Sequence, residues 1–157
     1  MSGAEPTTAT ATAPGRVPGC VFCDIVAGRV PAFEVLRDDV AVAFLDRSPL
    51  FPGHTLVIPC RHVVTLADLT PDEVGPYFER VRSIAAAMPV ALGAGGTFVA
   101  NNNIVSQSVA HLHVHVVPRR RGDGLRGFFW PRTRYEPGEA EAVAGVLRAG
   151  LDSFTEF

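Results

Sequence analysis

The sequence predicts several short strands and one long helix, a pattern that fits an α+β fold. Histidine alternates with apolar residues over 111–117, and this two-residue period is typical of a β-strand. A helix start, Thr-Pro-Asp-Glu at 70–73, opens the one long helical segment. Four further short runs lie between turn residues and are rich in apolar residues: 33–37, 40–45, 54–59 and 97–100.

Composition limits the class of protein. The 157 residues are 47% hydrophobic and 19% charged, which suits one globular domain with a sizeable core. The net charge of −2 gives no basic excess for nucleic acid, and no apolar run approaches the roughly 20 residues needed to span a membrane. Three cysteines argue against a disulfide framework, and the start of the chain lacks a signal-peptide pattern. We therefore expect a cytoplasmic protein.

The first part of the chain contains a tail and a possible metal motif. Residues 1–18, rich in Ala, Thr, Pro and Gly, predict a disordered tail; a mucin-like stalk would require secretion. Cys20 and Cys23 have the C-x2-C spacing of metal ligands, although two buried thiols or a redox pair fit equally well. Phe22, Ile25 and Val26 share one side of a short helix that Gly28 can close.

The central elements follow in order. Asp38-Asp39 predicts a hairpin turn between strands 33–37 and 40–45, and Pro59 is expected to stop strand 54–59. In the loop after Leu45, Asp46 could have a purely structural role as the cap of a turn. The long helix is expected to run from Thr70 toward Met88, with Pro89 at its end and a kink at Pro76.

The stretch from 111 to 117 carries the strongest functional signal. As one strand stopped by Pro118, it would place His111, His113 and His115 on a single face, with neighbours roughly 6.6 Å apart. Imidazoles in this arrangement can bind zinc, or they can supply a nucleophile with flanking proton donors. The preceding residues 101–108 offer uncharged donors for a phosphate group: Asn101, Asn102, Asn103, Gln107 and Ser108.

The C-terminal part is less informative. Arg119-Arg120-Arg121 is either a solvated loop or an attraction site for phosphate. Residues 125–132, aromatic and basic together, suit a docking segment or a wall of the site. A last amphipathic helix is expected over 138–150.

Taken in order, these motifs resemble the histidine triad (HIT) superfamily. His111-Leu-His113-Val-His115-Val-Val matches its signature of histidines and apolar residues. Gln107-Ser108-Val109, the segment 52–59, and Asp46 eight residues before His54 extend the match over roughly residues 19–119. The resemblance implies an α+β fold with a five-stranded antiparallel sheet, one long helix and one or two short ones. It also implies one HIT domain over 19–157, with a C-terminal extension from about 120, and a homodimer.

The resemblance also implies a chemistry. His113 would attack the α-phosphate of a purine nucleotide and form a nucleotidyl-histidine that water then hydrolyses. His115 would hold the phosphate oxygens, and the carbonyl of His111 would help to fix the tautomer of the nucleophile. The remaining nucleotide contacts, by the same resemblance, would come from Phe22, Ile25 and Leu45 at the base, Asp46 at the ribose, Asn101, Gln107 and Ser108 at the phosphate, and His54 close by.

Bacterial members of the family that carry zinc suggest a ligand set here. Cys20, Cys23, His62 and His111 would form a closed tetrahedral site, the pattern of structural zinc. One departure from the family is Ser106, which stands where members usually have glycine and narrows the backbone options.

The expected function is therefore that of a nucleotide hydrolase. We expect a dinucleoside polyphosphate such as diadenosine tetraphosphate as substrate, with a nucleoside phosphoramidate as the close alternative. His115, where the nucleotidyl-transferase branch has glutamine, favours the hydrolase branches. The segment 119–132 would supply the pocket of the leaving group, and removing its arginines is expected to weaken binding of polyphosphates more than of phosphoramidates. Two other classes stay open: a catalytic metal site on His111, His113 and His115, and a nucleotide-binding regulator with negligible turnover.

Overall fold

The protein is described by a computed structural model over residues 15–125 and 133–152. The chain divides into two compact units, residues 1–121 and 122–157. Most of the predicted tail and of the aromatic and basic segment 125–132 lies outside the described residues.

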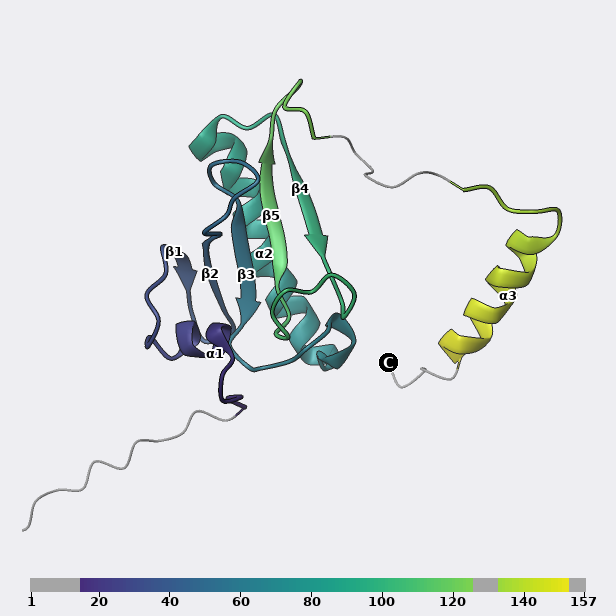
Figure 1. Ribbon diagram of the computed structural model, residues 1–157, viewed down its shortest axis with the longest axis horizontal. Helices are drawn as coiled ribbons and strands as arrows, with labels where there is room; N and C mark the ends of the chain where they lie inside the picture. The colour runs from purple at the N-terminus through teal and green to yellow at the C-terminus, as the bar shows by residue number, and fades with distance from the viewer. Residues whose placement is uncertain (1–14, 126–132, 153–157) are drawn as a thin grey trace, which may run out of the picture. The chain divides into compact units, whose positions relative to one another are not determined.

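Within the described residues of the first unit, five antiparallel strands form one sheet in the order β1-β2-β3-β5-β4 (Figure 1). This confirms the predicted α+β class and sheet. Asp38 makes the predicted hairpin turn, because its Oδ1 accepts hydrogen bonds from the backbone N–H groups of Val40 and Ala41, each at 2.9 Å. The strands are β1 (Glu34–Arg37), β2 (Ala41–Leu45), β3 (Thr55–Pro59), β4 (Gly96–Asn101) and β5 (Val114–Arg119).

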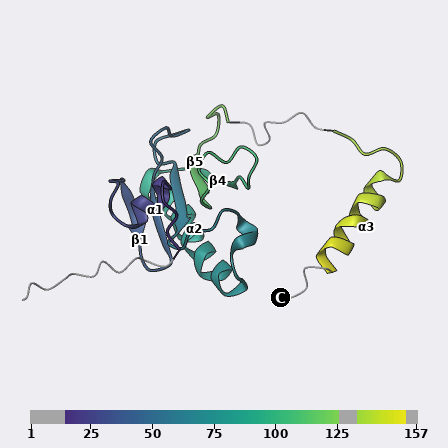
Figure 2. The same cartoon turned by 60° about the horizontal axis from the view of Figure 1, so that its bottom comes forward.

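Helices lie on both faces of the sheet, a long one along one face and a short one near the end of the other, as Figures 1 and 2 show. Successive residues of a strand point to opposite faces, and the two hydrophobic clusters follow this alternation. Ala41, Ala43 and Val57 pack with α2 (Pro71–Leu92), whereas Val42, Phe44, Leu56 and Ile58 pack with α1 (Val21–Val26). The face toward α2 is the main core, and the face toward α1 carries the site.

The helix α2 begins as predicted and ends later than predicted. Glu73 accepts from the backbone N–H of Thr70 at 2.9 Å, which completes a capping box. The helix continues through Pro76 and Pro89 and ends at Leu92; the residue that caps it, Gly93, has a left-handed φ of 62°. Pro89 removes only one hydrogen bond, while the packed face extends to Met88, so the expected end at Pro89 is wrong. That face consists of Tyr77, Val81, Ile84 and Met88.

The strand β5 also differs from its prediction, at both ends. The expected strand 111–117 begins at Val114, because the backbone groups before it bond elsewhere: Leu112 N–H donates to Val63 O at 2.7 Å, and His113 O accepts from the Asn101 side chain at 3.2 Å. Pro118 does not stop the strand. Pairing with β3 ends at Val116, so the residues beyond it pair only with β4 and a missing N–H is tolerated there.

The short helix α1 is confirmed, including its end. Gly28 has a φ of 70° and donates to the carbonyl of Ile25 at 2.9 Å. The Arg37 guanidinium on β1 donates to the carbonyls of Ile25 and Val26 at 2.9 and 2.8 Å. A helix of six residues is too short to be stable alone, so these contacts hold α1 against the sheet.

The other described helices are the 3-10 turn η1 (Leu66–Asp68) and, in the second unit, α3 (Glu139–Asp152). The helix α3 confirms the predicted helix over 138–150 to within two residues at its end. No helix among the described residues combines the length and apolar character that a membrane crossing requires.

Candidate functional site

A pocket of about 420 Å³ lies on the α1 face of the sheet. Its volume falls in the range of small-molecule sites. One part of its lining is apolar, and the other carries histidine, serine and carboxylate groups. Of the predicted nucleotide contacts, the pocket is lined by Phe22, Ile25, Leu45, Asp46, Ser108, His113 and His115.

His113 presents one ring nitrogen to this pocket. Its Nδ1 lies 2.7 Å from the carbonyl oxygen of His111, which can only accept, so Nδ1 carries the proton. In this tautomer the lone pair is on Nε2. Among the described residues, none is hydrogen-bonded to this Nε2. The Phe22 ring packs edge-on against His113, with the ring centres 5.3 Å apart. The ring is thus buried, oriented and able to act as a nucleophile.

His115 is paired with His54 behind it. His54 Nε2 lies 2.9 Å from His115 Nδ1, and the Leu50 backbone N–H donates to His54 Nδ1 at 3.1 Å. Burial, together with the neighbouring His113 and His54, lowers the pKa of His115 to about 4. Burial also lowers the pKa of His54, against the opposing effect of Asp46. Both rings are therefore neutral at pH 7.

Asp46 caps a turn and also lines the pocket. Its Oδ1 accepts from the backbone N–H of Ser48 at 2.8 Å, which is the structural role of capping a turn. Its Oδ2 lies 3.8 Å from His54 Nε2, and the residue also lines the pocket. The carboxylate is thus held in place by the loop and can still accept a hydrogen bond from a ligand.

The four predicted metal ligands converge beside the pocket. One ligand atom from each of Cys20, Cys23, His62 and His111 lies within 4.8 Å of all the others. His111 Nδ1 is 3.5 Å from Cys20 Sγ and 3.7 Å from Cys23 Sγ, and His62 Nδ1 is 3.3 Å from Cys23 Sγ. A tetrahedral zinc ion with ordinary bond lengths separates sulfur and nitrogen ligands by about 3.6 Å.

The ring of His111 is also oriented for a metal. Its Nε2 lies 3.0 Å from the carbonyl oxygen of Pro59, so Nε2 carries the proton and Nδ1 keeps its lone pair for the cluster. Burial raises the pKa of the Cys23 thiol, so a cation is needed to keep it as a thiolate. The donor set, the spacing and the outer hydrogen bond all fit a zinc ion.

Two predicted phosphate contacts, Asn101 and Gln107, are hydrogen-bonded to backbone groups instead. The Asn101 amide donates to the carbonyl of His113, as noted above. The Gln107 amide donates to Val64 O at 2.6 Å and accepts from Ile104 N–H at 2.8 Å. Neither residue lines the pocket, whereas Ser108 does. Ser106 has a left-handed φ of 61°, a conformation that glycine adopts at less cost.

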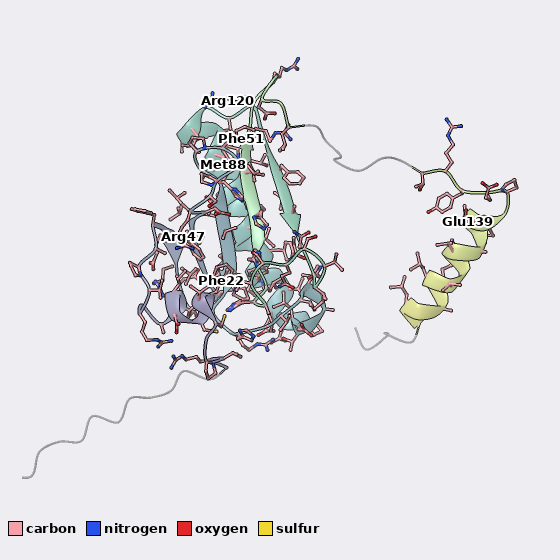
Figure 3. All side chains as sticks on the ribbon, viewed as in Figure 1. Phe22, Arg47, Phe51, Met88, Arg120 and Glu139 are labelled. Atoms are coloured by element: carbon pink, nitrogen blue, oxygen red, sulfur yellow. The ribbon has the colours of Figure 1, made fainter. Side chains whose placement is uncertain are left out.

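Sequence reasoning missed part of the pocket wall. The lining also includes Val30 and Phe33, from the segment between α1 and β1, and Arg47. Arg47 is labelled in Figure 3. Arg47 could have been found as the neighbour of Asp46, but nothing in the residues 30–33 distinguishes them from an ordinary loop. The basic run lies elsewhere: Arg120 donates to Leu92 O at the end of α2, far from Phe22 in Figure 3.

The comparisons with known proteins show the family of this chain. The model of the HIT domain family matches residues 27–122, more than half of the chain. An uncharacterised HIT-like protein of Mycobacterium tuberculosis is 38% identical over 134 residues, which cover 84% of this chain and 92% of that protein. The chain belongs to the HIT domain family, as its sequence motifs predict.

Two further relatives bear on the chemistry. The adenosine 5′-monophosphoramidase of Schizosaccharomyces pombe is 31% identical over 134 residues, which cover 84% of this chain and 98% of that protein. A zinc-bound histidine triad family protein of Mycobacterium smegmatis has the same fold, with a TM-score of 0.65 and 38% identity over 86% of this chain and 96% of that one.

Proposed function

We propose that this protein hydrolyses purine nucleotides at the α-phosphate through a nucleotidyl-His113 intermediate. The hydrogen bond from His113 Nδ1 to the His111 carbonyl carries this proposal, because it leaves the lone pair of Nε2 directed at the pocket. The same hydrogen bond stabilises the positive charge that the ring gains when Nε2 bonds to phosphorus.

The reaction has two steps. His113 Nε2 attacks the α-phosphorus, and the bond from phosphorus to the leaving group breaks. Water then attacks phosphorus, breaks the bond to Nε2, and releases a nucleoside monophosphate. His115 and Ser108 hold the phosphate oxygens, while Asp46 accepts a hydrogen bond from the ribose. The base lies against Phe22, Ile25 and Leu45.

A nucleoside phosphoramidate is the substrate that we favour, in place of the dinucleoside polyphosphate expected first. The pocket suits one nucleotide, and among the described residues that line it Arg47 is the sole lysine or arginine. A chain of further phosphates would need more cations than that. The relative from S. pombe, an adenosine 5′-monophosphoramidase by name, supports the same choice.

Turnover of adenosine 5′-phosphoramidate and of diadenosine tetraphosphate by the wild type and by His113→Ala tests the proposal. We expect AMP from the phosphoramidate with the wild type, and a loss of at least about 1,000-fold in the variant. Binding of AMP to the variant serves as the control for its fold. Equal activity in both proteins would contradict the covalent route, and AMP binding without turnover by the wild type would favour the regulator.

We further propose that Cys20, Cys23, His62 and His111 hold a structural zinc ion. When bound, the ion fixes α1 and the strand region before β5; its four protein ligands leave no position for substrate. The zinc-bound protein of M. smegmatis supports this assignment. The alternative, a catalytic metal on His111, His113 and His115, predicts that a chelator stops turnover before it lowers the melting temperature; a structural ion predicts that both fall together.

The protein is further proposed to be a cytoplasmic homodimer. The strand β4 is at the edge of the sheet and exposes Val99, and an edge strand of this kind is a template for pairing with another chain. Sedimentation equilibrium measures the mass, and a monomer at micromolar concentration would contradict this part of the proposal.

A further inference from the structure

We propose that the backbone N–H of Leu50, acting through His54, sets the position of the proton on His115. His54 is then a positioning residue: it makes His115 Nε2–H a hydrogen-bond donor toward the phosphate. The tautomers follow from the structure itself, and only their effect on turnover rests on the proposed function.

The first step is the bond between Leu50 and His54. A backbone N–H can only donate, so His54 Nδ1 must accept the hydrogen bond of 3.1 Å with its lone pair. The ring is 4% exposed and neutral at pH 7, as its lowered pKa indicates. A neutral imidazole with an unprotonated Nδ1 carries its single proton on Nε2.

The second step is the contact between the two rings. His54 Nε2–H faces His115 Nδ1 at 2.9 Å, and Asp46 Oδ2 at 3.8 Å also favours a proton at this nitrogen. His115 Nδ1 must therefore accept. Because His115 is also neutral at pH 7, its own proton lies on Nε2, and the ring lines the pocket. One backbone N–H thus orders the protons of two histidines.

The same placement of protons argues against a metal ion at the cluster formed by Asp46, His54 and His115. Asp46, His54 and His115 each offer a ligand atom within 4.8 Å of the other two, a spacing that suits a cation. A metal on His54 Nε2 would move the proton to Nδ1, where it would point at the N–H of Leu50. Two donors cannot share a hydrogen bond, so the cluster is suited to a proton rather than an ion.

The consequence is that two histidines of one run hold opposite tautomers. His113 is protonated on Nδ1 by its bond to the His111 carbonyl and offers a lone pair at Nε2. His115, ordered by His54, offers Nε2–H. A nucleophile and a donor therefore face the phosphate side by side.

Nitrogen-15 NMR of the histidine-labelled wild-type protein without substrate tests the tautomers directly. Protonated and unprotonated ring nitrogens differ widely in chemical shift. We expect Nε2–H tautomers for His54 and His115, the Nδ1–H tautomer for His113, and a scalar coupling between His54 Nε2 and His115 Nδ1 across their hydrogen bond. An Nδ1–H tautomer of His115 would overturn the inference, whatever the protein hydrolyses.

Two variants of His54 test the effect on turnover. The amide nitrogen of glutamine can replace the donor at Nε2, whereas asparagine reaches only the position of Nδ1. We expect kcat for the phosphoramidate to fall on the order of 10- to 100-fold in His54→Asn with a smaller change in KM, and to be largely restored in His54→Gln.

The melting temperatures of the two variants separate positioning from stability. Equal losses of kcat in His54→Asn and His54→Gln at similar melting temperatures would overturn the positioning role. If the wild type has no turnover at all, the proposed function fails, while the NMR result still decides the tautomers.

Discussion

Two clusters of potential metal ligands lie at the two ends of the histidine run, and they differ in kind. At one end His111 joins Cys20, Cys23 and His62; at the other, His115 joins His54 and Asp46. Both bring their ligand atoms within 4.8 Å of one another, and both combine buried with half-buried residues. Spacing and burial alone would therefore assign a metal to each.

The difference lies in the backbone group that bonds to the ring nitrogen facing away from the cluster, in His111 at one end and in His54 at the other. Nε2 of His111 donates to the Pro59 carbonyl, so Nδ1, which faces the thiols, keeps a lone pair for a cation. Nδ1 of His54 accepts from the Leu50 N–H, so Nε2, which faces His115, keeps a proton. A carbonyl behind a histidine prepares a metal ligand, and an amide behind it prepares a hydrogen-bond donor.

The largest effect is expected at the thiolate cluster, from Cys23→Ser. The change removes a proposed zinc ligand at a buried position, and we expect zinc content to fall and the free energy of unfolding to drop by about 3 kcal/mol or more. Metal analysis and denaturant unfolding measure both. Cys60→Ser, at a half-buried cysteine outside the cluster, is the matched control and should keep its zinc. Equal zinc content in both variants would contradict the assignment of a zinc ion to this cluster.

A smaller effect is expected from Leu50→Pro, which deletes the N–H but leaves every ring in place. His54 can then carry its proton on Nδ1, so the lone pair of Nε2 becomes free for a cation. We expect kcat to fall about tenfold and a second equivalent of Co²⁺ to bind without thiolate-to-cobalt absorption. Leu50→Ala keeps the N–H and is the control. If the proline variant binds no additional cobalt, the outer hydrogen bond does not decide between proton and ion.

The smallest effect is expected from Ser106→Gly, in the loop before the histidine run. Glycine relieves the left-handed φ, which costs serine roughly 1 kcal/mol, but it also gives the unfolded chain more freedom. We expect a net gain of about 0.5 kcal/mol in denaturant unfolding, with unchanged zinc content and kcat. This variant provides a baseline for the other two, and a loss of stability would show that the serine side chain contributes a contact.

The parts of the fold that follow from local pattern could be predicted from the sequence. Alternation over 111–117 correctly separates the histidines from Leu112, Val114 and Val116, which lie in the core against α2. The start of α2 follows from Thr70 and Glu73. What could not be predicted depends on partners distant in the sequence. Because Leu112 bonds to Val63, β5 begins later than the alternation predicts. Because pairing with β3 ends at Val116, Pro118 can lie within β5.

The same division applies to the site. The spacing of Cys20 and Cys23 and the order of the histidines indicate which residues meet, because each carries a distinctive side chain. The roles of Leu50 and Pro59 have no signal in the sequence, since any residue supplies a backbone N–H or carbonyl. Gln107 and Asn101 show the converse: their side chains suggest phosphate contacts, and the structure uses them to hold backbone.

The short helix α1 contributes to both the metal cluster and the pocket. It presents Cys23 to the cluster and Phe22 and Ile25 to the pocket wall, and its six residues have little helical stability of their own. With zinc bound as proposed, the ion and the nucleotide become thermodynamically linked, although they never touch. A ligand that needs α1 in place must raise the affinity for the ion, and the ion must raise the affinity for the ligand by the same factor. The affinity of this protein for its nucleotide would then vary with the zinc supply of the cell.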